Sequence, residues 1–186
     1  MTEQSTKKNK MTNVEEVQII NKGHGAGGKQ TNVNGKSFEK CMDLESFFKD
    51  YKKTNPNGSD YEIHYFKQGE MKKYFLKTFG IKLFRKPDEC IMVVVNEKFY
   101  VYVIEMKTQS VEGSVETKLW SGPSLKREYE IILGDRFVVN YAFCVNEFLH
   151  NKLQSCNIKY EILIKILKES EIVCFHSTDR CSHFNN

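Results

Sequence analysis

The chain has 186 residues, of which 40% are hydrophobic and 12% aromatic, and its formal net charge is +4. At about 100–200 residues per domain this length predicts one compact domain with its own core. No run approaches the roughly 18–20 apolar residues of a membrane helix, so no membrane association is expected. The polar start MTEQSTKKNKMTN lacks an apolar segment, so a secreted protein is not expected either. An intracellular location, cytoplasmic or in the nucleoid or nucleus, is therefore predicted.

The six cysteines are irregularly spaced, and most of them lie within apolar runs. This pattern favours buried free thiols in a reducing compartment over a disulfide framework. They are Cys41, Cys90, Cys144, Cys156, Cys174 and Cys181.

Residues 1–36 are rich in Lys, Asn, Thr and Gly and are predicted to form a mobile arm. Residues 37–186 are expected to form a single domain. Within the arm, GHGAGGKQTN resembles a phosphate-binding loop, but Gln30 stands where that loop needs a hydroxyl, and no helix signal follows. No nucleotide cofactor is therefore expected. Lys29 and Lys36 are instead predicted to contact DNA, with a solvated linker of no specific role as the alternative.

Beyond the arm, SFEKCMDLESFFKDYKKT has helical apolar spacing and predicts a helix over residues 37–54, ended by NPNG. Helix 123–133 carries Pro123 at its start and Gly134 after its end. The elements expected after residue 54 are, in chain order, strand 61–66, helix 70–79, strand 81–84, a hairpin of strands 90–95 and 99–107, a loop 108–118, helix 123–133, strand 137–145, amphipathic helices within 146–155 and 159–170, and strand 172–176. This order predicts an α/β (α+β) fold with a mixed central β-sheet flanked by helices.

The hairpin places three charged residues together. A two-residue turn at Asn96-Glu97 pairs Val95 with Lys98 and brings Asp88 opposite Glu105. Because side chains alternate along a strand, Lys107 projects from the same face as Glu105.

Two adjacent carboxylates repel each other unless a cation neutralises them. Mg²⁺ is commonly held by one or two carboxylates, waters and substrate phosphates. A lysine beside the ion orients the attacking water, as hydrolysis of a phosphodiester requires. The alternative is a solvated salt-bridge cluster. The unbroken apolar sequence before Glu105 favours a buried central strand instead.

With Pro87-Asp88 and Glu105-Met106-Lys107, the chain resembles the PD-(D/E)XK nuclease superfamily, to which many type II restriction endonucleases belong. Gln109 extends the motif to E-x-K-x-Q, and Glu39 occupies the place of the glutamate on the first helix. The resemblance covers residues 37–145 and implies an αβββαβ core.

The resemblance also implies a role for each of these residues. Asp88 and Glu105 would bind Mg²⁺, which Mn²⁺ can replace, together with the Met106 carbonyl. Lys107 would assist the water nucleophile and Glu39 would complete the metal or water shell. Gln109 would orient Lys107 or contact the scissile phosphate.

The segment after the catalytic strand mixes an aromatic residue with cations close to a helix N-terminus, which is typical of DNA backbone contact. The candidate DNA contacts here are Lys118, Trp120, Lys126 and Arg127. Core packing is the alternative for Trp120. GSVETK also resembles a motif that follows E-x-K in some restriction-type nucleases, which makes Glu116 a further candidate.

At the C-terminus, Cys174, His176, Cys181 and His183 lie within ten residues and are potential zinc ligands. Their spacing matches no zinc finger, so zinc is not the principal expectation.

The sequence thus predicts a Mg²⁺-dependent endonuclease that cuts a short specific sequence in double-stranded DNA as a homodimer. A structure-selective repair or junction nuclease is one alternative. A non-catalytic nucleic-acid-binding module on the same fold is the other.

Overall fold

The computed structural model describes residues 61–110, 113 and 115–177. The predicted arm 1–36 and helix 37–54 lie outside the described residues, and with them Lys29, Lys36 and Glu39. The elements in chain order are β1 (Tyr61–Lys67), α3 (Glu70–Phe79), β2 (Glu89–Val95), β3 (Lys98–Lys107), α4 (Val115–Trp120), α5 (Gly122–Leu133), β4 (Phe137–Val145), α6 (Glu147–Leu153), α7 (Ile158–Glu169) and β5 (Ile172–His176).

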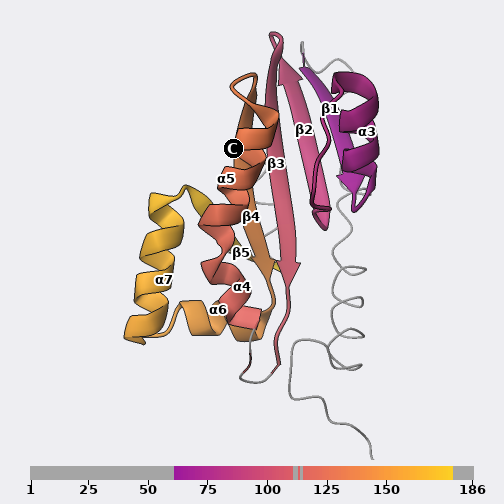
Figure 1. Ribbon diagram of the computed structural model, residues 1–186. Helices are drawn as coiled ribbons and strands as arrows, with labels where there is room; N and C mark the ends of the chain where they lie inside the picture. Colours follow the sequence, from indigo (N-terminus) through magenta and orange to yellow (C-terminus); the bar gives the residue numbers. More distant parts are fainter. Residues whose placement is uncertain (1–60, 111–112, 114, 178–186) are drawn as a thin grey trace, which may run out of the picture.

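The strands form one mixed sheet in the order β1-β2-β3-β4-β5 (Figure 1). β1, β2 and β3 are antiparallel neighbours, whereas β3, β4 and β5 are parallel. A hairpin needs only a short turn, and Asn96 and Glu97 supply it with positive φ values of 48° and 64°. Parallel neighbours need a longer crossover. The pairs α4–α5 and α6–α7 provide it, so the predicted mixed sheet with flanking helices is confirmed.

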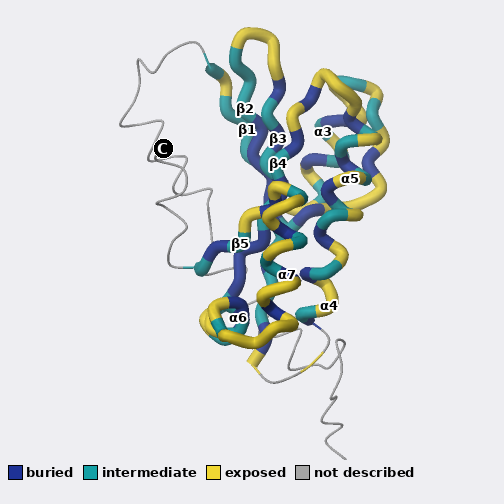
Figure 2. The backbone as a smooth tube through the Cα atoms, turned by 90° about the vertical axis from the view of Figure 1, so that its left-hand side faces the viewer, coloured by how far each residue is buried: buried dark blue, intermediate teal, exposed yellow. Residues whose placement is uncertain are grey.

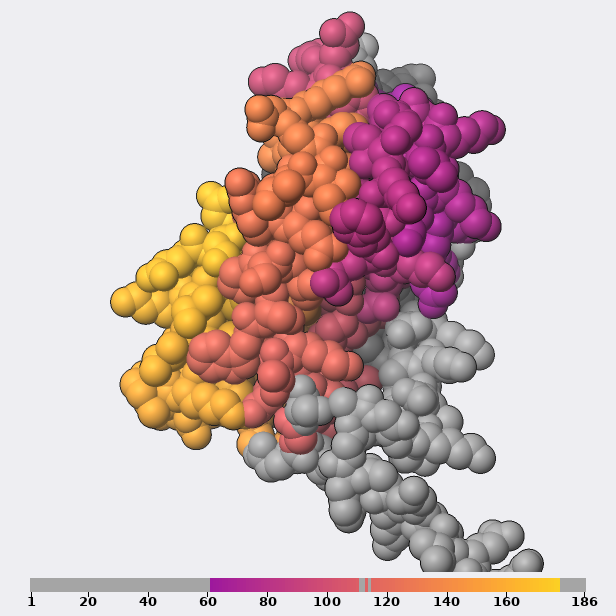
Figure 3. Space-filling model, viewed as in Figure 1, coloured from indigo at the N-terminus to yellow at the C-terminus, as the bar shows by residue number. Residues whose placement is uncertain are grey.

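The described helices all contribute residues to the larger core cluster. Of these, α3, α4, α5 and α7 lie beside one face of the sheet, and α6 lies near its end below β5 (Figure 2). Strand residues such as Val101 and Phe143 pack there against Phe75 of α3, Leu119 of α4 and Leu163 of α7, and all five are fully buried. Burying a side chain of this size stabilises the fold by about 1.5–3 kcal/mol. In the space-filling view, α3, α5 and α7 follow one another across this face from purple to yellow (Figure 3).

A second cluster of buried apolar residues lies on the opposite face and, among the described residues, comes from strands alone. It includes Ile104 and Met106 of β3. Since side chains alternate along a strand, Glu105 and Lys107 project to the helix-covered face. The candidate catalytic residues of β3 therefore lie between the sheet and the helices.

The strand predicted over residues 81–84 is wrong, because this segment is irregular. α3 ends at Gly80, whose left-handed φ of 70° turns the chain. Leu83 is buried, but Phe84 is 70% exposed. β2, which follows, is already paired on both sides by β1 and β3. The segment is thus a connection held to the core by the buried Leu83 and the partly buried Ile81.

The loop predicted over residues 108–118 is wrong in its second half, since helix α4 begins at Val115. Val115 and Leu119 are four residues apart and both buried, so packing against the core supports this short helix. α5 then begins at Gly122, where an added Cβ would lie 2.8 Å from the Phe143 ring. Only glycine lets the start of α5 approach β4 so closely.

Cys90 and Cys144 are buried and in no disulfide, as predicted, whereas Cys156 is exposed. Cys174 is a partly buried free thiol, and Cys41 and Cys181 lie outside the described residues. No helix in the described part of the chain has the length and apolarity needed to cross a membrane.

Candidate active site

The register of the hairpin brings Asp88 to Glu105. β2 and β3 pair from Val95 with Lys98 to Glu89 with Ile104, as predicted, and Asp88 is the next residue along. Its Oδ2 accepts a 2.7 Å hydrogen bond from the Met106 N–H. This bond fixes the aspartate beside the end of β3.

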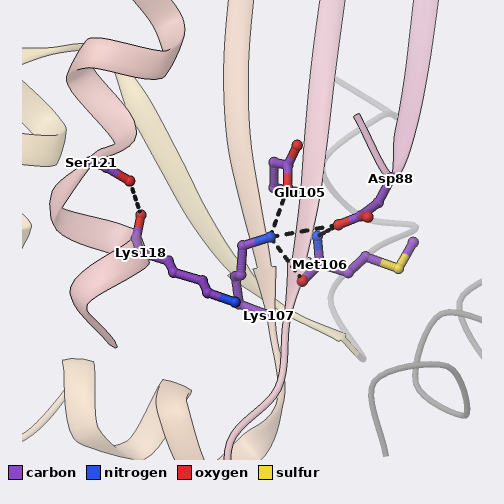
Figure 4. Close-up of polar contacts among 6 residues, drawn as sticks. All are labelled: Asp88, Glu105, Met106, Lys107, Lys118 and Ser121. Atoms are coloured by element: carbon purple, nitrogen blue, oxygen red, sulfur yellow. Dashed lines mark hydrogen bonds and ion pairs between the residues drawn. The ribbon is translucent and has the colours of Figure 1, made fainter. Parts of the chain in front are cut away.

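The Lys107 ammonium is surrounded by oxygens of this cluster (Figure 4). Nζ donates hydrogen bonds to Glu105 Oε2 at 2.7 Å and to the Met106 carbonyl at 3.1 Å. It lies 3.6 Å from Asp88 Oδ2. The Lys107, Glu105 and Asp88 side chains are only 14%, 18% and 24% exposed. Three oxygens therefore converge on one cation in a largely buried place.

Burial raises the pKa of Glu105 above its ordinary value. The Lys107 charge lowers this pKa and the Asp88 charge raises it again, and the net direction is upward. Burial also raises the pKa of Tyr141, and the Glu105 charge raises it further. Tyr141 belongs to β4 and lies in the core on the helix-covered face, to which Glu105 also projects. Burial therefore disfavours the ionised carboxylates of this site, and a bound cation would stabilise their charged form.

The oxygens of this cluster fit a small hard divalent cation. Mg²⁺ prefers oxygen ligands and retains several waters, so two carboxylates and one carbonyl are sufficient from the protein. The described residues contain no group of three or more His, Cys, Asp or Glu side chains that could hold a metal ion. The candidate oxygen ligands in this cluster are those of Asp88, Glu105 and the Met106 carbonyl. Glu39, which was also predicted to complete the shell, lies outside the described residues.

Gln109 is buried, and its backbone is bound by Asn146, a residue that sequence reasoning missed. Asn146 stands between β4 and α6, where its side chain accepts a hydrogen bond as the N-cap of α6. The N-cap signal in the sequence indicates this role. Its contact with the end of β3 depends on β4 lying beside β3.

A second residue that sequence reasoning missed is the acidic Glu89, which follows Asp88 directly. It is only 2% exposed, and Oε1 accepts a 2.7 Å hydrogen bond from the Tyr65 hydroxyl. Alternation along β2 sends this side chain to the opposite face. Glu89 is therefore not part of the cluster around Lys107.

The candidate DNA contacts differ in how exposed they are in the structure. Lys118 is exposed, and its side chain extends from α4 toward the end of β3 (Figure 4). Arg127 is 68% exposed and pairs with Glu130 at 3.0 Å. Trp120 is half-buried and packs against the core, as its alternative interpretation expected.

Lys126 is buried, whereas the predicted DNA contact requires an exposed side chain. It is 7% exposed, and Nζ donates to the Ser170 carbonyl at 2.9 Å and to Glu171 at 3.1 Å. The ammonium thus closes the C-terminal end of α7, where free carbonyls favour a cation. This buried and bonded ammonium does not fit the predicted DNA contact of Lys126.

Glu116 also lies outside the cluster around Lys107. It accepts hydrogen bonds from Lys159 and, at 2.5 Å, from the Tyr160 hydroxyl. Burial raises the pKa of Glu116, but the two hydrogen bonds outweigh it, and the net direction is downward. Glu116 therefore joins α4 to α7.

Glu116→Gln is expected to lower the free energy of unfolding by about 1–2 kcal/mol at pH 7, because two charge-assisted hydrogen bonds weaken. A carboxyl whose pKa is lowered by folding stabilises the protein above its ordinary pKa, and this contribution disappears as the pH falls through the folded pKa. The difference from wild type should therefore shrink below about pH 4.5. Urea denaturation across pH 3–7 measures it. The matched control Glu161→Gln, at an exposed position of the same helix pair, should change little; an equal loss in both variants would contradict the assignment.

Tyr129→Phe is expected to leave the free energy of unfolding unchanged or to raise it by about 1 kcal/mol. The Tyr129 hydroxyl is buried and has no hydrogen-bond partner in the described part of the chain, so its removal breaks no described bond. Tyr160→Phe is the matched comparison, since that hydroxyl donates to Glu116. It should be destabilising. Thermal and urea unfolding of both variants decide this, and a large loss in Tyr129→Phe would show that its hydroxyl is bonded.

The zinc hypothesis is tested only in part, because Cys181 and His183 lie outside the described residues. Burial raises the pKa of Cys174 to about 12, which disfavours the thiolate that zinc requires. The centroid of the His176 ring lies 5.1 Å from the centroid of the His150 ring.

Comparisons of the chain with protein-family models, with curated proteins and with solved structures found no match.

Proposed function

We propose that this protein is a Mg²⁺-dependent DNA endonuclease of the PD-(D/E)XK type, acting as a restriction-like enzyme on a short duplex sequence. The observation that carries the proposal is the convergence of Asp88, Glu105 and the Met106 carbonyl on the Lys107 ammonium. The order β1, β2, β3, α5, β4 supports the βββαβ part of the core that this superfamily would require.

The burial and charge of the cluster favour a hydrolytic metal site over a solvated salt-bridge cluster. A solvated salt bridge stabilises a protein little, and its members are usually exposed. Here each of the three charged side chains is less than one quarter exposed. Burial of two carboxylates opposes folding unless cations compensate, and one lysine supplies only half of that charge. Such a site favours a divalent cation.

Asp88, Glu105 and the Met106 carbonyl would hold the ion. When bound, it would stabilise negative charge on the phosphate and help a water to lose a proton. Lys107 would orient the attacking water through its ammonium, which lies within reach of both carboxylates. The Met106 N–H holds Asp88 in place. The low exposure of the cluster limits the access of bulk water.

Binding of DNA would require cationic side chains near this end of the sheet. Lys118 extends toward it and Arg127 is exposed on α5, the next helix. Lysine and arginine contacts to phosphates position a protein on DNA without reading its sequence. Cleavage of both strands at a short palindrome would further require a homodimer with two-fold symmetry.

A plasmid-cleavage assay tests the proposal. Purified protein should convert supercoiled plasmid into discrete linear fragments with Mg²⁺ and leave it intact with EDTA. Mapped fragment ends would then give the recognition sequence. Cleavage of branched DNA alone would replace the restriction role by a junction-nuclease role. DNA binding without metal-dependent cleavage of any duplex, branched or single-stranded substrate would overturn the nuclease proposal.

A further inference from the structure

Asn146 connects three parts of the fold at the candidate site: the end of β4, the first turn of α6 and the chain leaving β3. Its backbone N–H donates to the Lys107 carbonyl at 3.2 Å. Its side-chain Nδ2 donates to the Gln109 carbonyl at 2.9 Å, and its Oδ1 accepts from the Gln109 N–H at 3.2 Å. Asn146 thus holds the backbone of residues 107 and 109.

These bonds continue the sheet beyond its last regular pair. The parallel ladder of β3 and β4 ends at Lys107 with Val145. The next position of β4 is Asn146, and its amide offers one donor group and one acceptor, as a peptide group does. Oδ1 also caps α6 by accepting from the Leu149 N–H at 3.5 Å. Aspartate would keep the acceptor but lacks the donor.

The position of the Lys107 side chain depends on the backbone that Asn146 holds. Strand ends open more readily than strand centres, and Lys107 is the last residue of β3. Its ammonium must remain within 2.7–3.6 Å of oxygens on Glu105 and Asp88. Opening of the backbone at residues 107–109 would let the ammonium leave these oxygens.

We propose that Asn146 is a positioning residue of the candidate active site, holding the exit of β3 so that the Lys107 ammonium stays among the three oxygens. The proposal rests on the proposed function of that site. Asn146 itself need not contact DNA or metal. Its effect should appear in kcat more than in KM, since misplacement of a catalytic group by about 1 Å reduces the rate up to about 100-fold.

The test compares Asn146→Asp with Asn157→Asp in the full chain. Asn157 caps α7 through its side chain, which accepts from the Lys159 N–H at 3.0 Å, so the control makes the same substitution at another N-cap. In Asn146→Asp, a carboxylate oxygen would replace the Nδ2 donor and repel the Gln109 carbonyl, so this segment should open more often although the acceptor for the Gln109 N–H is kept. Amide exchange of Gln109 should therefore accelerate about tenfold or more, while that of Leu149 stays slow. The ¹⁵N signal of Lys107 Nζ should shift, and kcat should fall about 10- to 100-fold with KM nearly unchanged. Asn157→Asp should change none of these.

Unchanged exchange at Gln109 in Asn146→Asp would show that the Nδ2 donor does not hold this segment, which would overturn the proposal. Faster exchange with an unmoved Lys107 signal, or with wild-type kcat, would overturn the positioning role. If wild-type protein cleaves no DNA, the nuclease proposal fails, and the Gln109 exchange and Lys107 signal still decide whether Asn146 positions the ammonium.

Discussion

Lys107→Ala is expected to lower the rate of Mg²⁺-dependent DNA cleavage by about 100- to 10,000-fold, the range for loss of a group that assists proton transfer. The ammonium is the only cation described within 4 Å of both Asp88 and Glu105 among the residues that the structure places. Without it, no described side chain would orient the attacking water. Conversion of supercoiled plasmid under excess enzyme measures the effect on the chemical step.

The same variant should separate catalysis from metal binding. The ammonium contacts the oxygens that would hold the ion, so its removal should leave Mg²⁺ or Mn²⁺ affinity unchanged or increase it. Without metal, two buried carboxylates lose their partner, and the free energy of unfolding should fall by about 1–3 kcal/mol. Added Mg²⁺ should restore part of that loss.

Lys98→Ala is the matched control, because Lys98 is exposed at the start of the same strand. It should cleave DNA at the wild-type rate. Wild-type cleavage by Lys107→Ala would contradict the catalytic assignment. Loss of both cleavage and metal affinity would instead indicate that Lys107 maintains the structure of the site.

Asp88→Asn is expected to weaken Mg²⁺ or Mn²⁺ binding at least tenfold and to reduce cleavage at least 100-fold. Hard divalent cations prefer charged oxygens, and this change removes one of the two carboxylates. Asparagine still presents an oxygen to the Met106 N–H, which Asp88 Oδ2 now binds at 2.7 Å. The free energy of unfolding should therefore change by less than about 1 kcal/mol.

Titration calorimetry measures the metal affinity directly, and plasmid cleavage measures the activity. Asp135→Asn, at an exposed position before β4, is the control for the lost charge. It should bind metal and cut DNA as the wild type does. Tight metal binding by Asp88→Asn would show that this carboxylate is not a ligand, whatever its effect on cleavage.

The central hairpin could be predicted from the sequence because its determinants are local. Two β-branched and aromatic runs flank Asn96-Glu97, and a two-residue turn permits one register. That register and the alternation of side chains bring Asp88, Glu105 and Lys107 together, although 19 positions separate the first from the last. Strong apolar periodicity likewise predicted β1, α3, β4, α6, α7 and β5.

Contacts between distant segments could not be predicted in this way. Lys126 binds Ser170 and Glu171, 44 and 45 residues away. Asn146 binds Gln109 across 37 residues. These pairs depend on which helix or strand lies beside which, and no local pattern encodes that choice. Residues 81–84 likewise form no strand, because their place between α3 and β2 buries Leu83 and leaves Phe84 exposed.

The sequence by itself thus determined most of the described elements, the hairpin register and the cluster of Asp88, Glu105 and Lys107, because short loops and side-chain alternation restrict neighbours along the chain. Tertiary structure alone decided which charges are buried and which residue holds the end of β3. Burial is a property of packed layers: the sheet and the helices on one of its faces must assemble before Lys126 loses solvent or Asn146 meets Gln109.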